Sequence, residues 1–400
     1  MSSVEEYQSA ILSAIVPLAP ASLELADAEG CVLAEDVTAA VALPPFDNSS
    51  MDGYAVLAAD VAGAAPDSPA TLRVTGEIAA GDVGGYRLAP GTAIKIMTGA
   101  RLPAGADAVA QVEWTDGGSA QVEVYRPAEP GTAVRYAGGD AAAGETLLTA
   151  GTRMRPMQIA VAASAGRNAV AVRPRPRVVV LSTGDELTEP GTPLVPGRIW
   201  DSNSYMLVAA AREAGAVAYR RAVVRDDPAG VLPALEEQLT RADLLITTGG
   251  VSMGGEHDVV KAALHELGTV DFRKVAMQPG MPQGFGVIGD AEVPIFTLPG
   301  NPVSAYVSFQ LFVRPALAAL QGTDDLTLAA KPATLTAPAR SPAGRRSYLR
   351  GVLDGGEVTP LSGQQSHQIA SLGRANALII VPEWETQLPA GSAVDVLILP

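Results

Sequence analysis

Glycine, hydroxyl-bearing and acidic residues are concentrated in five short segments in the second half of the chain. Such residues after a strand can bind phosphate, because small residues let backbone N–H groups approach the oxygens and a following helix adds positive potential. Carboxylates beside them are the ligands that Mg²⁺ needs when it bridges phosphate oxygens. One such loop alone is more often a set of helix caps and turns, but five at one sheet edge predict a ligand site. The segments are 182–186, 225–228, 247–258, 278–282 and 298–304.

Strands and helices alternate around these segments. Apolar stretches such as 178–181 are typical of buried strands, and stretches with helical spacing follow most of the loops. This order predicts right-handed βαβ units and a mostly parallel sheet, whose carboxyl edge collects the loops. The predicted strands are 178–181, 217–224, 244–246, 270–276 and 294–298, and the predicted helices are 204–215, 228–241, 258–267 and 302–320.

The rest of the chain is poor in helical patterns. Residues 4–18 and 156–165 are the predicted helices outside the βαβ region. Short strands between glycine and proline turns predict a β-rich module over about 55–145, and the proline-rich stretch 173–177 is typical of a linker. After residue 331 no helical period survives, and short strands suggest a small β-barrel. The predicted fold class is α/β multidomain, with a mostly parallel sheet, a β-rich module and a C-terminal β-barrel.

The chain is acidic and has a single cysteine. Its 400 residues include 28 Lys and Arg against 43 Asp and Glu, and the net charge of −15 disfavours nucleic-acid binding because a polyanion is repelled. Cys31 alone forms neither an internal disulfide nor a cysteine zinc site, and three histidines are too few for a histidine-rich metal site. The N-terminus is acidic where a signal peptide is basic, and no apolar run reaches about 18 residues, so we expect a cytoplasmic protein without a membrane span.

Two short motifs point to other functions. Residues 284–289 match the dinucleotide-binding pattern, but a turn into another strand follows where a helix is required, so this function is excluded. Residues 250–254 match the nucleophile elbow of serine hydrolases, with Ser252 as nucleophile. The later histidines available to it are His265 and His367, and the neighbouring glycine and carboxylates favour an anion-and-metal loop. Hydrolysis by Ser252 stays an alternative, whereas the missing Gly-Lys-Ser/Thr excludes a Walker A loop.

Five sequence motifs in a fixed order identify a known family. They read FDNSSMDGYA at 46–55, IMTGA at 96–100, STGDEL at 182–187, TGGVS at 248–252 and LPGNPVS at 298–304. Together they resemble the molybdopterin molybdenumtransferase (MoeA) family, to which the E domain of gephyrin is also similar. The resemblance implies insertion of molybdate into adenylylated molybdopterin, with Mg²⁺-dependent release of AMP to give molybdenum cofactor.

The family resemblance also implies a domain organisation and partners. An elongated homodimer is expected, and a molybdopterin adenylyltransferase and molybdoenzyme apoproteins or their chaperones are the expected partners, with no nucleic acid and no membrane. The implied domains are an N-terminal linking domain (1–45 plus 141–174), an inserted β-rich domain (46–140), an α/β molybdopterin-binding domain (175–325) and a C-terminal β-barrel domain (326–400).

Site residues follow from the resemblance position by position, and the chemistry agrees with the loops described above. The implied catalytic residues are Asp52, Thr98, Glu186, Asp226, Asp258 and Lys274. The implied molybdopterin- and oxyanion-binding residues are Gly249, Gly250, Val251, Ser252, Pro299, Gly300, Asn301, Pro302, Arg350 and Ser366. Glu186, Asp226 and Asp258 are expected to hold the metal and position the pyrophosphate. Asp52 and Thr98 are expected to reach in from the other protomer.

The chain departs from the family pattern in one loop. Many members have Lys-Pro-Gly-Lys-Pro after the strand that ends near Lys274, but here residues 278–282 read Gln-Pro-Gly-Met-Pro. Gln278 can still donate a hydrogen bond to an oxyanion, whereas Met281 cannot replace a charge. Either anion affinity is lower or the nearby basic run 340–350 compensates. A non-catalytic or specialised paralogue that binds molybdopterin as a carrier or scaffold is therefore the alternative function.

Overall fold

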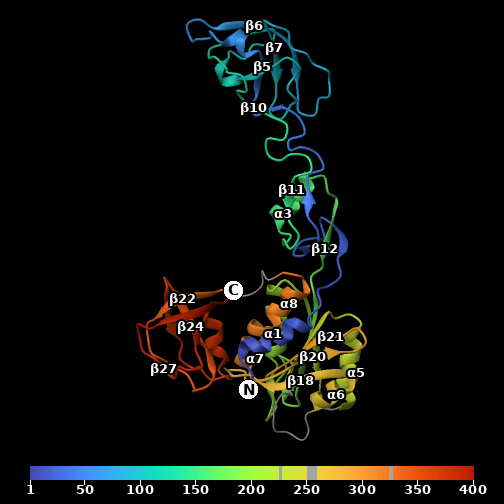
Figure 1. The fold of residues 1–400 in the computed structure, drawn as a ribbon, viewed down its shortest axis with the longest axis vertical. Coiled ribbons are helices and arrows are strands. Elements are labelled where there is room, and N and C mark those ends of the chain that lie inside the picture. The colour runs from blue at the N-terminus through green and yellow to red at the C-terminus, as the bar shows by residue number, and fades with distance from the viewer. Residues whose placement is uncertain (225–227, 250–258, 324–327) are drawn as a thin grey trace. The chain divides into compact units, whose positions relative to one another are not determined.

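The structure is a computed structural model, and it describes residues 1–224, 228–249, 259–323 and 328–400 (Figure 1). The chain forms two compact units. The first contains Met1–Ala21, Gly30–Ala34 and Val172–Pro400, and the second contains Ser22–Glu29 and Glu35–Ala171. The two units are described separately below.

A six-stranded mixed sheet forms the centre of the first unit. Five strands run in the same direction, in agreement with the mostly parallel sheet predicted from the βαβ pattern, and β20 alone runs antiparallel to both of its neighbours, β21 and β18. Strand β20 pairs antiparallel with β21 because only a short turn around Gly289 joins the two strands. This turn is too short for the helical crossover that parallel strands require. The order is β16 (Val217–Val224), β13 (Arg177–Thr183), β17 (Leu244–Thr248), β21 (Val293–Leu298), β20 (Pro282–Ile288) and β18 (Gly268–Lys274).

Helices cover both faces of this sheet. Val178 and Val180 belong to the core shared with α1, α4, α7 and α8, while Val179 and Leu181 pack with α5 and α6. Strand β13 is therefore apolar on both sides, which is why its sequence is a continuous apolar run. The helices are α1 (Val4–Ala14), α4 (Asn203–Glu213), α5 (Pro228–Leu239), α6 (Val259–Leu267), α7 (Pro302–Ser308) and α8 (Arg314–Leu320), with a π-helical turn (Phe309–Val313) between the last two.

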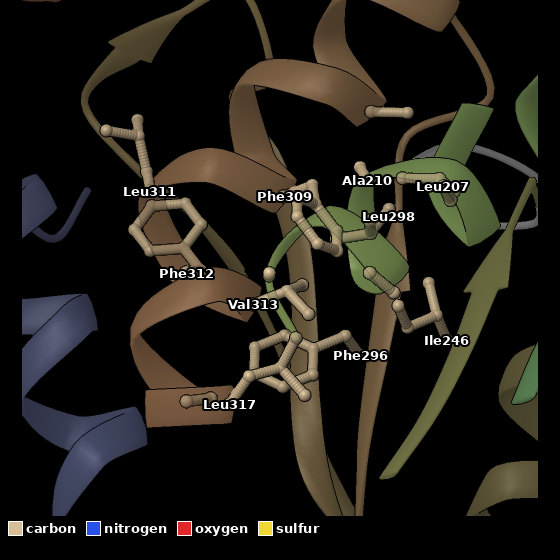
Figure 2. Packing of buried hydrophobic residues seen from close by; sticks show 14 of the residues in the cluster. Leu207, Ala210, Ile246, Phe296, Leu298, Phe309, Leu311, Phe312, Val313 and Leu317 are labelled. Atoms are coloured by element: carbon tan, nitrogen blue, oxygen red, sulfur yellow. The ribbon is translucent and has the colours of Figure 1, made fainter. Parts of the chain in front are cut away.

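The segment from α7 to α8 is the main packing helix of the larger core. In Figure 2 its Phe309, Val313 and Leu317 point toward the sheet, where Ile246 and Phe296 lie. Pro302–Leu320 is long and apolar enough to cross a membrane, but 83% of that window is buried inside the fold. Within the part of the chain that the structure describes, this candidate span is thus a core helix.

A closed β-barrel follows in the same unit. Its strands pair in the order β24-β25-β22-β28-β26, and β24 also pairs with β26, which closes the barrel as predicted. The short strand β19 pairs in parallel with β24 and so joins the barrel to the segment that follows β18. The bounds are β19 (Met277–Gln278), β22 (Ala330–Leu335), β24 (Arg346–Asp354), β25 (Glu357–Pro360), β26 (Ala377–Val381) and β28 (Ala393–Ile398), with β23 (Ala339–Arg340), β27 (Gln387–Leu388) and a 3₁₀ helix (Ile369–Arg374) beside them.

The second unit is built on a five-stranded sheet, as the β-rich pattern predicted. Tyr54, Leu72 and Val122 are buried in its core. The order is β8 (Ala108–Gln111), β5 (Gly53–Val56), β7 (Thr92–Ile96), β6 (Ala70–Ile78) and β9 (Gln121–Val124). The unit also contains α2 (Ala58–Val61), α3 (Pro156–Ser164), β3 (Val37–Thr38), β4 (Asn48–Ser49), β10 (Val134–Arg135), β11 (Thr146–Leu148) and a 3₁₀ turn (Val112–Trp114). The remaining short strands among the described residues are β1 (Ala21–Glu24), β2 (Val32–Leu33), β12 (Ala169–Arg173), β14 (Leu187–Thr188) and β15 (Ile199–Trp200).

Candidate functional site

Three of the predicted loops begin at the same level of the sheet. Ser182 of β13 lies opposite Thr248 of β17, which in turn lies opposite Leu298 of β21. These strands are parallel, so the residues that follow them emerge together at the carboxyl edge. Of the other predicted loops, 225–227 and 250–258 fall outside the described residues, and with them Asp226, Gly250, Val251, Ser252 and Asp258.

Gly249 is where the strand ends approach one another most closely. Its N–H donates to the Leu298 carbonyl at 3.3 Å, and its φ of +99° favours glycine. A Cβ at this position would lie 2.6 Å from the Thr183 carbonyl oxygen, which is closer than any side chain can pack. The sequence has glycine here because the backbone of β17 must pass directly beside that of β13.

Glu186 places a carboxylate over the end of β13. Its side chain is exposed, and a Cβ added to Gly184 would lie 2.6 Å from Glu186 Oε2, so the carboxylate folds back toward the strand end. Among the described residues no group of three His, Cys, Asp or Glu side chains lies close enough together to hold a metal ion. The other two members of the predicted metal set, Asp226 and Asp258, lie outside those residues.

A pocket of about 250 Å³ lies where the sheet end meets the barrel. Asn301 Nδ2 donates to Ser366 Oγ at 3.0 Å, and the Val303 N–H donates to the Ser366 carbonyl at 3.1 Å, which joins the start of α7 to a barrel loop. The pocket therefore contains three of the predicted binding residues, Pro299, Asn301 and Ser366. We call it the anion pocket, and its lining is Met277, Gln278, Pro279, Gly280, Met281, Pro282, Pro299, Asn301, Ser304, Arg345, Gln364 and Ser366.

Arg345 is the one charged residue that lines the anion pocket among the described residues. It is half-buried, and no carboxylate shares the lining with it. It belongs to the basic run 340–350, in which the family resemblance pointed to Arg350 and not to Arg345 as a site residue. The signal available in the sequence was the replacement of two family lysines by Gln278 and Met281, which removes two cations from the lining of the same pocket.

Arg350, predicted to contact an anion, is fully buried in β24 and does not line the anion pocket. Its Nε donates to Ser371 Oγ at 2.8 Å, and its Nη2 donates to the carbonyls of Gly363 and Gln365, while Nη1 has no partner. Burial lowers the pKa of the Arg350 guanidinium. These contacts hold the 363–365 loop immediately before Ser366, and the anion contact of Arg350 stays a prediction.

The remaining predicted residues of the first unit lie around the pocket. Lys274 ends β18 and is exposed, and its side chain is not part of the pocket lining. Gly300 is exposed at the strand end, and Pro302 is the first residue of α7, where proline is favoured because the missing N–H is not needed.

Asp52 and Thr98 meet in the second unit although 46 residues separate them. The Thr98 N–H donates to Asp52 Oδ1 at 2.7 Å, and Thr98 Oγ1 donates to the same oxygen at 2.9 Å. The backbone hydrogen bond, followed by the side-chain one, holds the pKa of the Asp52 carboxyl below its ordinary value. Both residues are exposed, so this unit presents an ionised carboxylate to solvent.

Comparison with known proteins assigns this combination of a βαβ sheet, a polar strand-end edge and a barrel to one class of biosynthetic enzyme. Three family models match in order: "MoeA N-terminal region (domain I and II)" over residues 2–166, "Probable molybdopterin binding domain" over 179–319 and "MoeA C-terminal region (domain IV)" over 332–399.

Similar proteins carry consistent names. "Molybdopterin molybdenumtransferase 2" of Mycobacterium tuberculosis is 45% identical and "Molybdopterin molybdenumtransferase 1" of the same organism is 40% identical; the first match covers 99% of both chains, the second 100% of this chain and 99% of the relative. The crystal structure of a MoeA protein from Pyrococcus horikoshii, 33% identical, superimposes with a TM-score of 0.84 and covers 100% of this chain and 99% of its own. The chain belongs to the MoeA family. The predicted family, fold class and class of function, that of a molybdopterin molybdenumtransferase, are thereby confirmed.

Proposed function

We propose that this chain inserts molybdenum from molybdate into adenylylated molybdopterin and releases AMP. The observation that supports this most directly is the anion pocket, which combines Arg345 with the polar side chains of Gln278, Asn301 and Ser366 and has no carboxylate in its described lining. A site with these groups suits a small oxyanion, because the guanidinium compensates its charge and the neutral side chains donate hydrogen bonds to it. The described lining offers no carboxylate that would bind a cation instead. Molybdate is the oxyanion that the family's reaction requires.

The carboxyl edge of the sheet is proposed to hold the pterin phosphate and the linked adenylate. Gly249 lets the ends of β17 and β13 approach each other there, and the edge lies in the same unit as the anion pocket, with Pro299, Gly300 and Asn301 connecting the two. Attack of water on the phosphoanhydride between the two phosphates yields AMP and leaves the second phosphate on the pterin. In the pocket beside it two Mo–S bonds form to the dithiolene, and one molybdate oxygen leaves as water with the two protons of the dithiol, so molybdenum keeps its oxidation state. Donors fixed by the fold stabilise the charge that develops on the phosphate oxygens.

Mg²⁺ is proposed as the metal of this reaction, and the donor chemistry of Glu186 fits it. A hard cation prefers carboxylate oxygens, and Glu186 presents an exposed carboxylate at the strand-end edge. Asp226 and Asp258 complete the proposed ligand set. When bound, the metal neutralises charge on the bridging phosphate oxygens.

Residues of the second unit are proposed to complete the active site of a partner protomer in a homodimer. Asp52, kept ionised by Thr98, is suited to position a cationic or metal-bound group rather than an anion. We further propose a cytoplasmic location, an adenylyltransferase as the source of the substrate, and apoproteins of molybdoenzymes or their chaperones as acceptors.

The experiment that tests the proposed function is AMP release from adenylylated molybdopterin in the presence of Mg²⁺, with and without molybdate. Molybdate-dependent release together with formation of a cofactor that activates an apo-molybdoenzyme supports the transferase. Release that does not depend on molybdate contradicts the proposed coupling.

A carrier or scaffold role is the second candidate, because Gln278 and Met281 stand in the anion pocket where many family members have lysines. In that case the protein binds molybdopterin tightly but does not release AMP in the same assay. The presence of Arg345 in the pocket favours the transferase, since it supplies a positive charge to the same cavity.

A further inference from the structure

The stretch Asp201–Ser202–Asn203–Ser204, at the start of α4, is bonded to three separate strand ends. Asp201 is buried and accepts from Ser182 Oγ at 3.0 Å, which fixes it to the end of β13. It also accepts from the Ser204 N–H at 3.1 Å and from Ser204 Oγ at 2.5 Å, which fixes it to the first turn of its own helix. Asp201 therefore fixes the start of α4 to the end of β13, and with it the position of the Asn203 backbone.

Asn203 reaches the other two strand ends with one nitrogen. Its Nδ2 donates to Thr248 Oγ1 at 2.9 Å and to the Gly300 carbonyl at 2.7 Å. An amide nitrogen carries two hydrogens, so each of these bonds uses one of them. Thr248 Oγ1 in turn donates to the Pro299 carbonyl at 3.4 Å, which closes a small network between β17 and the loop after β21.

The residues that Asn203 holds are the immediate neighbours of proposed binding residues. Thr248 precedes Gly249, and Gly300 precedes Asn301, which donates to Ser366 in the anion pocket. Asn203 is itself buried, and its Oδ1 has no partner, a cost that a purely apolar packing residue would avoid. An aspartate at this position could not donate both bonds, and a leucine could donate neither.

We propose that Asn203 is a positioning residue of the transferase site, which sets the separation of the Thr248–Gly249 and Gly300–Asn301 peptides and thereby aligns the anion pocket. The proposal rests on the proposed function, because the aligned pocket is the one assigned to molybdate. Asn203 touches no substrate in this scheme and acts through Gly300 and Thr248. Its loss should therefore weaken the oxyanion step more than it changes the overall fold.

The test compares Asn203→Asp with Ser202→Ala, a control at the adjacent exposed residue, whose side chain makes no capping hydrogen bond. Amide hydrogen exchange by mass spectrometry reports the loops directly, because the Val303 and Gly249 N–H groups are bonded to Ser366 and Leu298. We expect peptides over 244–249 and 299–304 to exchange faster by about tenfold in Asn203→Asp and not in the control. Unchanged exchange would overturn the proposal whatever the activity.

Kinetics provide the second readout. We expect the KM for molybdate in AMP release to rise by about tenfold with a smaller change in kcat. In a double-mutant cycle with Asn301→Ala the two effects should be less than additive, because both variants misplace the same peptide. Additive effects, or an unchanged KM in an active enzyme with faster exchange, would reduce Asn203 to a structural residue.

One alternative variant and one alternative measurement cover the cases in which Asn203→Asp does not fold or the wild-type protein is inactive. If Asn203→Asp does not fold, Thr248→Val removes one of the two acceptors with little change in shape, and the same exchange and KM shifts are expected at reduced size. If the wild-type protein releases no AMP, the proposed function fails, and the proposal for Asn203 is decided by exchange and by equilibrium binding of molybdopterin, which should weaken in Asn203→Asp.

Discussion

Replacing Arg345 with glutamine removes the charge from the described lining of the anion pocket while leaving a polar side chain of similar reach. Glutamine retains a hydrogen-bond donor, so the loss is the charge assistance of the guanidinium rather than the whole contact. The pocket contains no described carboxylate that would cancel this charge in the wild-type protein. We therefore expect the variant to bind molybdate less tightly and to be otherwise folded as the wild type.

The size of the effect follows from the environment of Arg345. A hydrogen bond to a charged group contributes about 1.5–3 kcal/mol, and the half-buried position keeps solvent screening moderate. This corresponds to a rise of about 10- to 150-fold in the KM for molybdate. The kcat should change little, because the lost interaction exists equally before and during the reaction.

The assay is AMP release from adenylylated molybdopterin at fixed Mg²⁺ over a series of molybdate concentrations. Arg340→Gln is the matched control, since Arg340 belongs to the same basic run, is exposed and does not line the pocket. A KM for molybdate that stays within about twofold of wild type in Arg345→Gln would refute the assignment of this pocket to the oxyanion. An equal loss in Arg340→Gln would show a general effect of surface charge instead.

Three further changes test other parts of the site. Met281→Lys restores a cation to the pocket wall and should lower the KM for molybdate by roughly fivefold, the equivalent of about 1 kcal/mol, in the same assay. Arg350→Met removes the guanidinium donor from the carbonyls of Gly363 and Gln365, which keep only their bonds from Ser371 Oγ and the Gln368 N–H, and should lower the free energy of unfolding by about 1–3 kcal/mol, measured by urea denaturation. Thr98→Val removes one of two hydrogen bonds to Asp52, so the pKa of that carboxyl should rise partway to its ordinary value, measured by NMR titration.

Each of these three predictions has a result that contradicts it. A raised KM in Met281→Lys would mean that the methionine packs against the ligand. Unchanged stability in Arg350→Met with a large loss of molybdate affinity would favour the direct anion contact that the family resemblance implies for Arg350. An unchanged pKa of Asp52 in Thr98→Val would mean that the Thr98 backbone N–H alone lowers this pKa.

Because the pKa of Asp52 is lowered on folding, its contribution to stability is present above the unfolded pKa and is lost as the pH falls through the folded one.

The sequence predicted the frame of the site better than its individual side chains. The apolar run at 178–181 and the loops after the strands define a parallel core with one polar edge, because burial on both faces demands that pattern. The antiparallel pair β20 and β21 was not predicted as such, since a strand that joins a hairpin looks locally like one that joins a crossover. The first helix ends at Ala14 rather than at residue 18, ahead of Pro17, which cannot continue the hydrogen-bonded ladder.

Side-chain roles within the basic run could not be read from residue type. Arg345 and Arg350 are five residues apart, and their different surroundings depend on how β24 closes the barrel and where the 363–365 loop passes over it. Asn203 was missed for a related reason. In sequence it is one polar residue among several at the start of a helix, and its two acceptors come from segments 45 and 97 positions further along the chain.

The pairing of β19 with β24 has a consequence for how the protein unfolds. This short strand pairing joins the sheet to the barrel, and the side chain of Arg346 in β24 also donates a hydrogen bond to Glu5 of α1. An oxyanion that binds Gln278 of β19 together with Arg345 and Ser366 would add a further link between the sheet and the barrel at the same place. Saturating ligand should then merge the melting of barrel and sheet into one cooperative transition, so that calorimetry detects occupancy of the pocket even where no turnover takes place.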